Sequence, residues 1–566
     1  MNDPLFDVKA QDAQVADLLK SEEEDLMKVL SDKYGLPYIN LQSIAPEPDA
    51  LRFIKEIDAR RAQVAPFKLV GRKLYVATPA PASPAVEELL RPIETRGTEL
   101  VLYLCSHASL EHVFSRYTDL NESSKVNTGL LDLSLKKMEG LASTFQTPDD
   151  MARLFDELVS SNALYKTTRI IELIIAGALK FDASDVHIEP EEKTVRVRYR
   201  LNGVLEDVAH IDAPSLKQIT SRLKLMAGLK LSTVANSQDG RFSIDLGEVE
   251  VDVRVSVIPG TYGESFVMRL LDPRHTVSDT KGLAILPVLR EALERALAKP
   301  NGVILTTGPT GSGKTTTLYA FLRELYSPGV KILTIEDPVE YHLDGITQTQ
   351  VDTDKDYTFL SGLRAALRQD PDIIMVGEIR DEDTAKVAIN AALTGHLVLS
   401  TLHTNSAAGT IPRLIDLKVN PKVIGSALSL ALAQRLVRVL CDECKQEDIT
   451  NEKETRIITN VLGAMKSSGM EDSMMGFVPD FQYHVFRPVG CLKCHGGYRG
   501  RTGIFEALVM NAEVEKILAS NPSEREVREA ALSSKIPSLL QDAILKVLQG
   551  TTSLEEVGKV VDLFGE

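Results

Sequence analysis

The spacing of hydrophobic residues changes along the chain, and each spacing predicts a different structure. Residues 1–120 alternate helix-spaced apolar positions with short apolar runs at 63–70 and 72–77, which predicts a small α/β domain. Residues 121–150 are mostly polar, lack a sustained apolar period and predict a linker. The chain therefore begins with a small domain that is separated from the rest.

Strict alternation follows in the next region. In residues 194–201 and 248–257, every second position is apolar, and the positions between are mainly charged. This period of two predicts strands with one buried and one charged face. Arg198 and Arg254 lie on those charged faces, which are either solvated surface or part of a site. We predict an α+β domain over residues 151–277.

From residue 278 the strands become apolar on both faces, and helical segments separate them. Near-continuous apolar strands of this kind predict a parallel sheet that is covered on both sides. The predicted strands are residues 302–307, 331–335, 373–376 and 397–401. We predict one α/β domain over residues 278–566, with helices at its C-terminal end.

Composition and charge narrow the class of protein. The 566 residues are 43% hydrophobic and 25% charged, with a formal net charge of −16. Such an acidic chain is a poor candidate for non-specific nucleic-acid binding, which needs a basic face. We find no run of about 18 uncharged apolar residues and no signal peptide at the acidic start, so we expect a cytoplasmic protein.

A phosphate-binding loop follows the strand at 302–307. The motif consists of Gly308, Pro309, Thr310, Gly311, Ser312, Gly313, Lys314 and Thr315, and Thr316 follows it. Every fixed position of the Walker A pattern is present, between a strand and a helix. The glycines let backbone N–H groups face the phosphates, Lys314 is expected to bind the β- and γ-phosphates, and the Thr315 hydroxyl to bind Mg²⁺. We therefore predict ATP and Mg²⁺ as cofactors.

Carboxylates follow two neighbouring strands of the same domain. Glu378 comes after the strand at 373–376, as in a Walker B motif, and is expected to act on Mg²⁺. Glu336, Asp337 and Glu340 follow the strand at 331–335. Three acidic residues at a strand end could form an acidic surface loop, but beside the Walker motifs a cation site is favoured.

Two histidines border the strand at 397–401. His396 precedes it and His403 follows it. A single histidine is usually a structural residue, whereas two beside a strand of the nucleotide-binding sheet are candidates for contacts with the phosphates.

Four of the five cysteines form two CxxC pairs. The pairs are Cys441 with Cys444 and Cys491 with Cys494, and 46 residues separate them. Four thiolates of this kind suit a tetrahedral, closed Zn²⁺ site with a structural role. Reduced, metal-free thiols are the alternative.

Several motifs, in this order, resemble the ATPases of type II secretion and type IV pilus assembly. The segments are residues 183–190, 238–241, 334–341, 375–381 and 394–405, and residues 34–38 resemble the docking domain of that family more weakly. The resemblance implies a RecA-like P-loop ATPase domain with a mainly parallel sheet, preceded by the α+β domain and a smaller N-terminal α/β docking domain. It also implies a zinc insertion at 441–494.

The resemblance implies a function as well. Members of this family form homohexamers on the cytoplasmic side of an inner-membrane platform protein, and ATP hydrolysis moves pilin-like subunits. Membrane association is then peripheral, through partners, and no nucleic acid is expected. By position, Glu340 would activate water, Glu378 would act with Mg²⁺, and His403 would contact the γ-phosphate. Glu336 and Asp337 would belong to the nucleotide site.

Phosphoryl transfer needs positive charge beyond that of the P-loop lysine. Arg198, Arg254 and Arg269 of the α+β domain are candidates to supply it when that domain closes. The alternative is that these arginines solvate a sheet face or pair with Glu250 and Asp252.

The alternatives to an assembly ATPase are a pilus retraction ATPase, a nucleic-acid translocase and a scaffold that does not hydrolyse ATP. A pilus retraction ATPase generally lacks the long N-terminal region and the cysteine pairs. A nucleic-acid translocase of the P-loop type is disfavoured by the acidic charge, and a scaffold without hydrolysis is disfavoured by Glu340 and Glu378. The family often has an acidic residue where this chain has Asn202.

Overall fold

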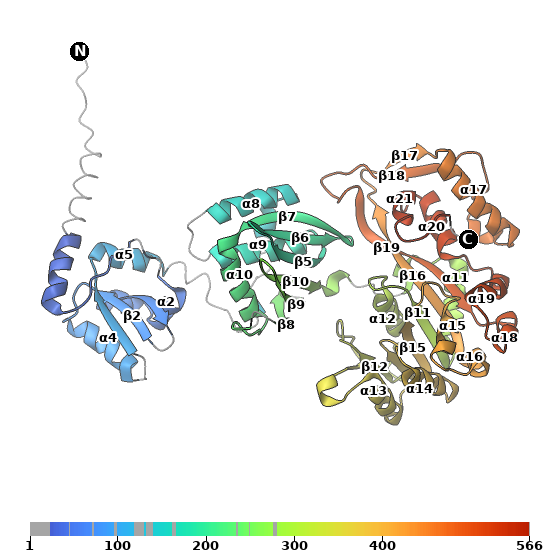
Figure 1. Ribbon diagram of the computed structural model, residues 1–566, viewed down its shortest axis with the longest axis horizontal. Helices are drawn as coiled ribbons and strands as arrows, with labels where there is room; N and C mark the ends of the chain where they lie inside the picture. The colour runs from blue at the N-terminus through green and yellow to red at the C-terminus, as the bar shows by residue number, and fades with distance from the viewer. Residues whose placement is uncertain are drawn as a thin grey trace, which may run out of the picture. The chain divides into compact units, whose positions relative to one another are not determined.

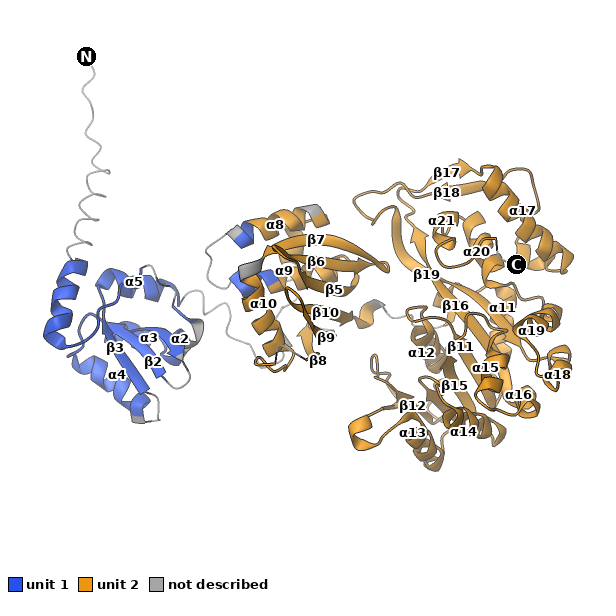
Figure 2. Cartoon of the chain, viewed as in Figure 1, with its two compact units in different colours: residues 1–132, 157–170 blue, residues 133–156, 171–566 orange. Residues whose placement is uncertain are grey.

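The computed structural model describes most of the chain. The described residues are 23–564, apart from 43, 45, 71–72, 96–98, 118–129, 132–139, 161–165, 234–235, 248 and 276–279. They divide into two compact units, one of residues 1–132 with 157–170 and one of residues 133–156 with 171–566 (Figure 2). Among the described residues, no helix is long and apolar enough to cross a membrane.

Residues 130–131 and 140–150 of the predicted linker are among the described residues. Its residues 121–129 and 132–139 lie outside the described residues. Helix α8 spans Pro148–Ser160 and therefore begins inside the predicted linker. The second compact unit contains the predicted ATPase domain and the predicted α+β domain apart from residues 157–170. The domain boundaries themselves stay predictions.

The first unit contains a three-stranded sheet with the order β1-β2-β3 (Figure 1). The elements are β1 (Ala65–Val70), β2 (Lys73–Thr78), β3 (Glu99–Leu104), α2 (Pro48–Phe53), α3 (Glu56–Ala62), α4 (Pro84–Thr95) and α5 (His107–Ser115). Strand β2 pairs antiparallel with β1 and parallel with β3. Strands β1 and β2 fall on the two predicted apolar runs, so the α/β prediction for this region is confirmed.

An antiparallel sheet follows in the second unit, with neighbouring strands in the order β8-β9-β10-β5-β6-β7. Its strands are β5 (Ala183–Pro190), β6 (Thr194–Leu201), β7 (Val204–Asp212), β8 (Gln238–Asp245), β9 (Glu250–Gly260) and β10 (Gly263–Leu271), and helix α10 spans Ala213–Met226. The apolar positions of β6 are buried and the arginine positions are partly exposed. The predicted alternation is therefore confirmed.

The second sheet of this unit has the order β13-β12-β14-β15-β11-β16-β19. Its strands are β11 (Gly302–Thr307), β12 (Ile332–Glu336), β13 (Thr347–Gln350), β14 (Ile373–Val376), β15 (Leu397–Leu402), β16 (Leu428–Leu440) and β19 (Tyr498–Val509). All neighbours pair parallel except β16 and β19. The predicted parallel sheet is confirmed.

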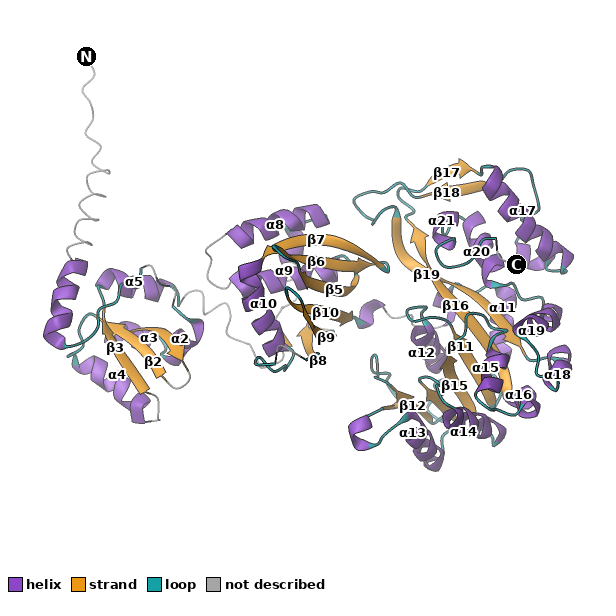
Figure 3. Cartoon of the chain, in the orientation of Figure 1, coloured by secondary structure: helices purple, strands orange, loops and turns teal. Residues whose placement is uncertain are grey.

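Helices cover both faces of this sheet (Figure 3). The relevant helices are α11 (Pro287–Leu297), α12 (Lys314–Leu325), α13 (Phe359–Ala366), α14 (Glu382–Leu393), α15 (Thr410–Asp416) and α16 (Pro421–Ala427). Ile304 of β11 packs in a cluster with residues of α11 and α12. Its neighbours Val303 and Leu305 pack in a second hydrophobic cluster, with residues of α13 to α16. Because successive side chains of a strand point to opposite faces, β11 is buried on both sides.

The register of the parallel strands determines where the functional loops lie. Thr307 at the end of β11 pairs with Leu402 at the end of β15. Val376 at the end of β14 pairs with Ser400 of β15 and with Ile335 of β12. The loops after these four strands therefore emerge at one edge of the sheet, where ligands bind in open α/β folds.

The segment between the two cysteine pairs forms its own small elements. They are β17 (Gln446–Ile449), α17 (Glu452–Ser467) and β18 (His484–Arg487), and the C-terminal helices are α18 (Ala512–Leu518), α19 (Glu524–Ala531), α20 (Leu539–Leu548) and α21 (Leu554–Val557). Ile458 and Leu462 of α17 are buried in the same apolar cluster as Ile544 of α20. The insertion is therefore packed onto the ATPase core.

Candidate active site

The P-loop is shaped by close contact with strand β16. Gly308, Gly311 and Gly313 have φ angles of 146°, 77° and 90°, which side chains rarely adopt. A Cβ atom on Gly308 would lie 2.6 Å from the carbonyl oxygen of Gln434, and one on Gly313 would lie 2.7 Å from its Nε2. Glycine is therefore required here both by backbone angle and by space.

The donors of the loop fit a phosphate group. Lys314 Nζ donates to the carbonyl oxygens of Gly308 and Pro309, at 2.9 and 3.0 Å. Burial lowers the pKa of Lys314, and the Glu378 carboxylate opposes that shift. Ser312 Oγ is buried and has no hydrogen-bond partner in the described chain. A lysine bonded only to its own loop, at a helix N-terminus, matches the donor set that binds ATP phosphates.

The first acidic residue after β12 is enclosed. The Glu336 residue is only 3% exposed. Its carboxylate accepts hydrogen bonds from Thr334 Oγ1 at 2.6 Å and Gln348 Nε2 at 3.1 Å, and from the hydroxyl of Tyr319. Burial raises the pKa of Glu336. The Glu336 side chain therefore stabilises the acidic loop through buried hydrogen bonds. Its predicted contact with the nucleotide stays a prediction.

Tyr319 connects the P-loop helix to this acidic loop, which the sequence did not predict. Its hydroxyl donates to Glu336 and accepts the N–H of Glu340 at 3.3 Å. Its ring meets that of Tyr341 edge to face, with centroids 4.6 Å apart. Helix α12 begins at Lys314, so one short helix links the lysine to the loop that carries Glu340.

Glu340 meets an arginine of the preceding sheet. Arg254 Nη1 lies 2.9 Å from Glu340 Oε2, and Arg254 Nη2 donates to the carbonyl oxygen of Val339 at 2.6 Å. The two side chains are 29% and 32% exposed, so the pair remains accessible. Asp337 is exposed beside them. Residues 86 positions apart are thus joined at the edge of the ATPase sheet.

The Walker B carboxylate lies at the same edge. The Glu378 side chain is 13% exposed and pairs with Arg380. His403 Nε2 lies 3.2 Å from Glu378 Oε2, and its side chain is half exposed. Strands β14 and β15 therefore bring Glu378 and His403 together near Lys314. Their predicted contacts with Mg²⁺ and the γ-phosphate stay predictions.

His396 is placed elsewhere, and its prediction as a phosphate contact is wrong. The residue precedes β15, whose first residue Leu397 pairs with Gly302 at the start of β11. Six residues separate it from Leu402 at the P-loop edge, a distance of about 20 Å at about 3.3 Å per residue. Its Nδ1 instead lies 3.0 Å from the carbonyl oxygen of Ala391 in helix α14.

The other two candidate arginines bind carboxylates of their own sheet. Arg198 Nη2 lies 2.7 Å from Glu189 Oε1, and its side chain is 23% exposed. Arg269 Nε lies 2.9 Å from Asp185 Oδ1, although its side chain remains 59% exposed. Among the three predicted arginines, the structure thus brings Arg254 alone to the acidic loop.

Arg435 of strand β16 is a second residue that the sequence analysis missed. Its Nη2 donates to the carbonyl oxygen of Asn405 at 2.8 Å, and its Nη1 to that of Gln434 at 3.0 Å. Asn405 lies two residues after His403, so Arg435 ties that loop to the strand behind the P-loop. Its only signal in the sequence is a basic residue within an apolar run.

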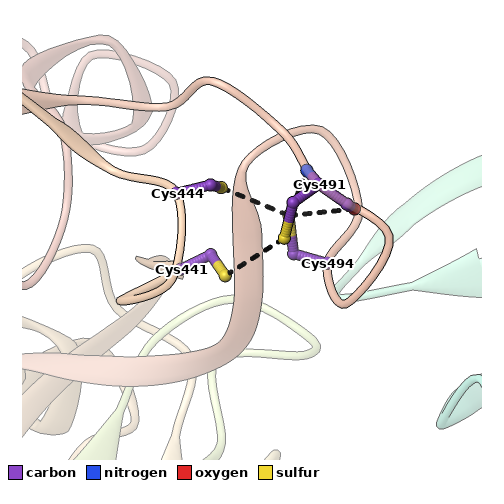
Figure 4. Close-up of side chains that lie close together, drawn as sticks. All are labelled: Cys441, Cys444, Cys491 and Cys494. Carbon is purple, nitrogen blue, oxygen red and sulfur yellow. Dashed lines mark hydrogen bonds between the residues drawn. The ribbon is translucent and has the colours of Figure 1, made fainter.

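The four predicted zinc ligands come together at one end of the β16–β19 pair (Figure 4). The Sγ atoms of Cys441 and Cys491 are 3.9 Å apart, and those of Cys444 and Cys494 are 3.6 Å apart. All four lie within 4.8 Å of one another. A Zn²⁺ ion with Zn–S bonds of about 2.3 Å has S–S separations of about 3.8 Å, so the four thiols fit it.

Comparisons with known proteins agree with this geometry. The model of the family "Type II/IV secretion system protein" matches residues 162–559, and that of the MshEN domain matches residues 34–124. The chain belongs to the Type II/IV secretion system protein family. It is therefore an ATPase of this family.

Individual relatives support the same assignment. The chain is 46% identical to the type II secretion system protein E of Aeromonas hydrophila, over 69% of this chain and 75% of that protein. It is 37% identical to the type IV pilus assembly ATPase PilB of Myxococcus xanthus, over 95% and 91% of the two chains. The structure of the Legionella pneumophila ATPase DotB is similar in fold, with a TM-score of 0.50 at 22% identity over 69% and 95% of the chains.

Proposed function

We propose that this ATPase hydrolyses ATP to drive the assembly of type IV pili or type II secretion pseudopili. In this proposal it acts as a homohexamer on the cytoplasmic face of an inner-membrane platform protein. The observation that carries a motor function is the contact between Arg254 and Glu340. It joins the predicted α+β domain to the loop whose carboxylate would activate water.

The residues at the sheet edge divide the work of hydrolysis. Lys314 and the backbone of the P-loop would hold the phosphates, and Thr315 and Glu378 would hold Mg²⁺. That ion neutralises phosphate charge during phosphoryl transfer. Glu340 would accept the proton of the attacking water, and Tyr319 would hold the backbone of Glu340 at a fixed place relative to helix α12.

Arg254 gives hydrolysis its dependence on domain position. In the present arrangement the guanidinium of Arg254 holds the Glu340 carboxylate at the edge of the sheet. A small movement of the α+β domain would release Glu340 and leave a positive charge beside the phosphates. Because the charge belongs to a separate region, turnover would follow domain movement, which is what a mechanical motor requires. Arg269 remains exposed enough to act on a neighbouring protomer.

The Cys₄ cluster is proposed to hold one structural zinc per chain. Burial raises the pKa of the Cys441 thiol and raises that of Cys494 to about 12. Thiols with raised pKa values become thiolates when a cation binds them. Elemental analysis of protein purified without chelator should give a zinc-to-chain ratio near one, and a ratio near zero would falsify the assignment.

One genetic experiment tests the biological role. The chromosomal gene is replaced by its Glu340→Gln version, and surface pili and secreted proteins are both measured. Loss of pili with normal secretion indicates pilus assembly, and the reverse indicates type II secretion. If neither changes while the variant is produced at the normal level, the proposed role fails. Pili that accumulate, instead of disappearing, would indicate a retraction motor.

A further inference from the structure

The loop that carries the second cysteine pair contacts the predicted α+β domain at three places. The N–H of Gly500 donates to Asn202 Oδ1 at 3.0 Å. His495 Nδ1 lies 3.7 Å from Glu206 Oε2. The His495 ring also meets that of Phe181 edge to face, with centroids 5.9 Å apart and planes at 90°. A hydrogen bond, a polar contact and an aromatic contact thus converge on the short segment 495–500.

The partner of this loop is the tight turn between β6 and β7. Asn202 and Gly203 have φ angles of 50° and 88°, as in a two-residue hairpin turn with both central residues left-handed. Arg200 Nη1 donates to the carbonyl oxygen of Gly203 at 3.1 Å and fixes the tip. A Cβ on Gly203 would be 3.7 Å from Arg501 Nη1, so the turn packs directly on the segment after the cysteines.

The contact lies beside the nucleotide site. A cavity of about 830 Å³ is lined by Cys491 and His495 of the loop, by Asn202 of the turn, and by Gly313 and Thr316 at the start of helix α12. The cysteine loop and the P-loop helix therefore both line this cavity. A movement of the cysteine loop or of the P-loop helix would therefore change the shape of the same cavity.

The cysteine loop has no helix or strand of its own, and it contacts the segment of the first cysteine pair through a hydrogen bond from the N–H of Cys441 to the carbonyl oxygen of Gly497 and the ion pair of Lys493 with Glu443. Residues 488–497 form turns without a strand or helix, between β18 and β19. Loops of this kind are held by the metal, because the energy of metal binding is the energy of their folding. We therefore expect the fold of the loop that receives the turn to depend on the metal.

We infer that the Cys₄ centre forms the docking surface for the α+β domain on its own chain. Metal binding then stabilises both the local loop and the arrangement in which Arg254 reaches Glu340. This rests on the zinc site proposed above, but not on the cargo or the machine that the ATPase serves. The alternative is that the metal stabilises the fold of residues 441–508 and has no effect on the α+β domain.

Hydrogen-exchange mass spectrometry of the full chain separates the two readings. Exchange is compared for zinc-loaded protein, chelator-treated protein and the zinc-loaded variants Asn202→Ala and Asn202→Asp. Aspartate retains the acceptor oxygen for Gly500, whereas alanine removes it. Segments 200–207, 488–501 and 302–307 are followed, the last as an internal reference within a buried strand.

The docking account predicts a coupled response. Chelation should raise exchange in 488–501 and also in the turn at 200–207, and leave 302–307 unchanged. Asn202→Ala should raise exchange at Gly500 by roughly two- to tenfold, which is the net effect of one hydrogen bond. It should do so with the zinc content unaltered, and Asn202→Asp should behave as the wild type does.

Two outcomes would overturn the inference. If chelation speeds exchange within 441–508 and leaves the turn unchanged, the metal acts locally and the loop is no docking surface. If Asn202→Ala exchanges at Gly500 as the wild type does, the contact does not exist in solution. Absence of zinc from the purified protein contradicts the zinc proposal instead, while the Asn202 variants still test the docking contact.

Discussion

The P-loop and the charged sheet of the α+β domain carry their positive charge in opposite ways. Lys314 lies within eight consecutive residues that fold as one loop, and its Nζ is held by the carbonyl oxygens of Gly308 and Pro309. On the sheet, Arg198, Arg254 and Arg269 come from three strands, and two of them pair with carboxylates of that sheet. A contiguous motif thus fixes its own geometry, whereas strand residues depend on tertiary neighbours.

This difference means that the site has one positive charge that is always present, on Lys314, and one that depends on the position of the α+β domain, on Arg254. A charge held by its own loop is present in every arrangement of the domains. A charge on a separate sheet is present only when that sheet is close, as Arg254 is to Glu340. We expect the P-loop to determine whether nucleotide binds, and the sheet to determine when it is hydrolysed.

The largest effect is expected at the permanent charge. Lys314→Ala should abolish ATP turnover and weaken nucleotide binding, because no other described side chain replaces the ammonium in the loop. The unfolding free energy should change by no more than about 0.5 kcal/mol, since the side chain is not part of the core. Turnover, nucleotide titration and thermal unfolding test this. Near-normal hydrolysis by a folded variant would refute the site.

Glu340→Gln should separate binding from hydrolysis. The amide keeps the size of the side chain but cannot accept a proton, so turnover should fall by about 10²–10⁴-fold. Nucleotide affinity should stay within a few-fold of the wild type because the P-loop is untouched. Equal losses of affinity and turnover would indicate that Glu340 is structural.

Arg254→Ala should reduce turnover less than Glu340→Gln, and Arg198→Ala is its matched control on the same sheet. Arg254 remains about one-third exposed. We therefore expect a loss of about 10–10²-fold, below the 10³–10⁵-fold of a fully engaged arginine. Arg198→Ala should change turnover by less than threefold because its partner is Glu189. Similar losses in both variants would show that the sheet acts only through its stability.

Apart from the Arg198 control, the smallest loss of turnover is expected at Arg435. Arg435→Lys keeps the positive charge but cannot bridge the carbonyl oxygens of Gln434 and Asn405 with a planar fork. Turnover should fall by about tenfold, the equivalent of one lost hydrogen bond at the upper end of its range, with ATP affinity retained. Arg435→Gln should lower affinity as well. A variant with lysine that loses affinity but not turnover would make Arg435 a binding residue instead.

The sequence predicted the elements whose signals are local. Four of the seven strands of the ATPase sheet, the P-loop and the two cysteine pairs are contiguous patterns, and β6, β11 and β14 occupy the predicted residues. Strands β13, β16 and β19 of that sheet were not predicted. His396 was misjudged because both ends of a strand look alike in sequence, while only the carboxyl end of a parallel strand reaches the site. The register that separates the ends is a property of the sheet.

Residues that act across the fold were beyond the sequence analysis. Tyr319 looked like one more buried aromatic residue of a helix, and its hydroxyl gains meaning only when β12 brings Glu336 beside it. The three arginines were equivalent in sequence and became distinct through their partners. The contact of Asn202 with Gly500 joins positions 298 residues apart, a separation at which no local pattern gives information.

A double-mutant cycle tests most directly whether Arg254 and Glu340 act on one event. Single-turnover ATP hydrolysis is measured for the wild type, Arg254→Ala, Glu340→Gln and the double variant, in the assembled enzyme at saturating ATP. If both residues act in the same step, the double variant should be no slower than Glu340→Gln alone, since contacting residues are not additive. If the two losses multiply, the residues act independently and the dependence of hydrolysis on the α+β domain through this contact is contradicted.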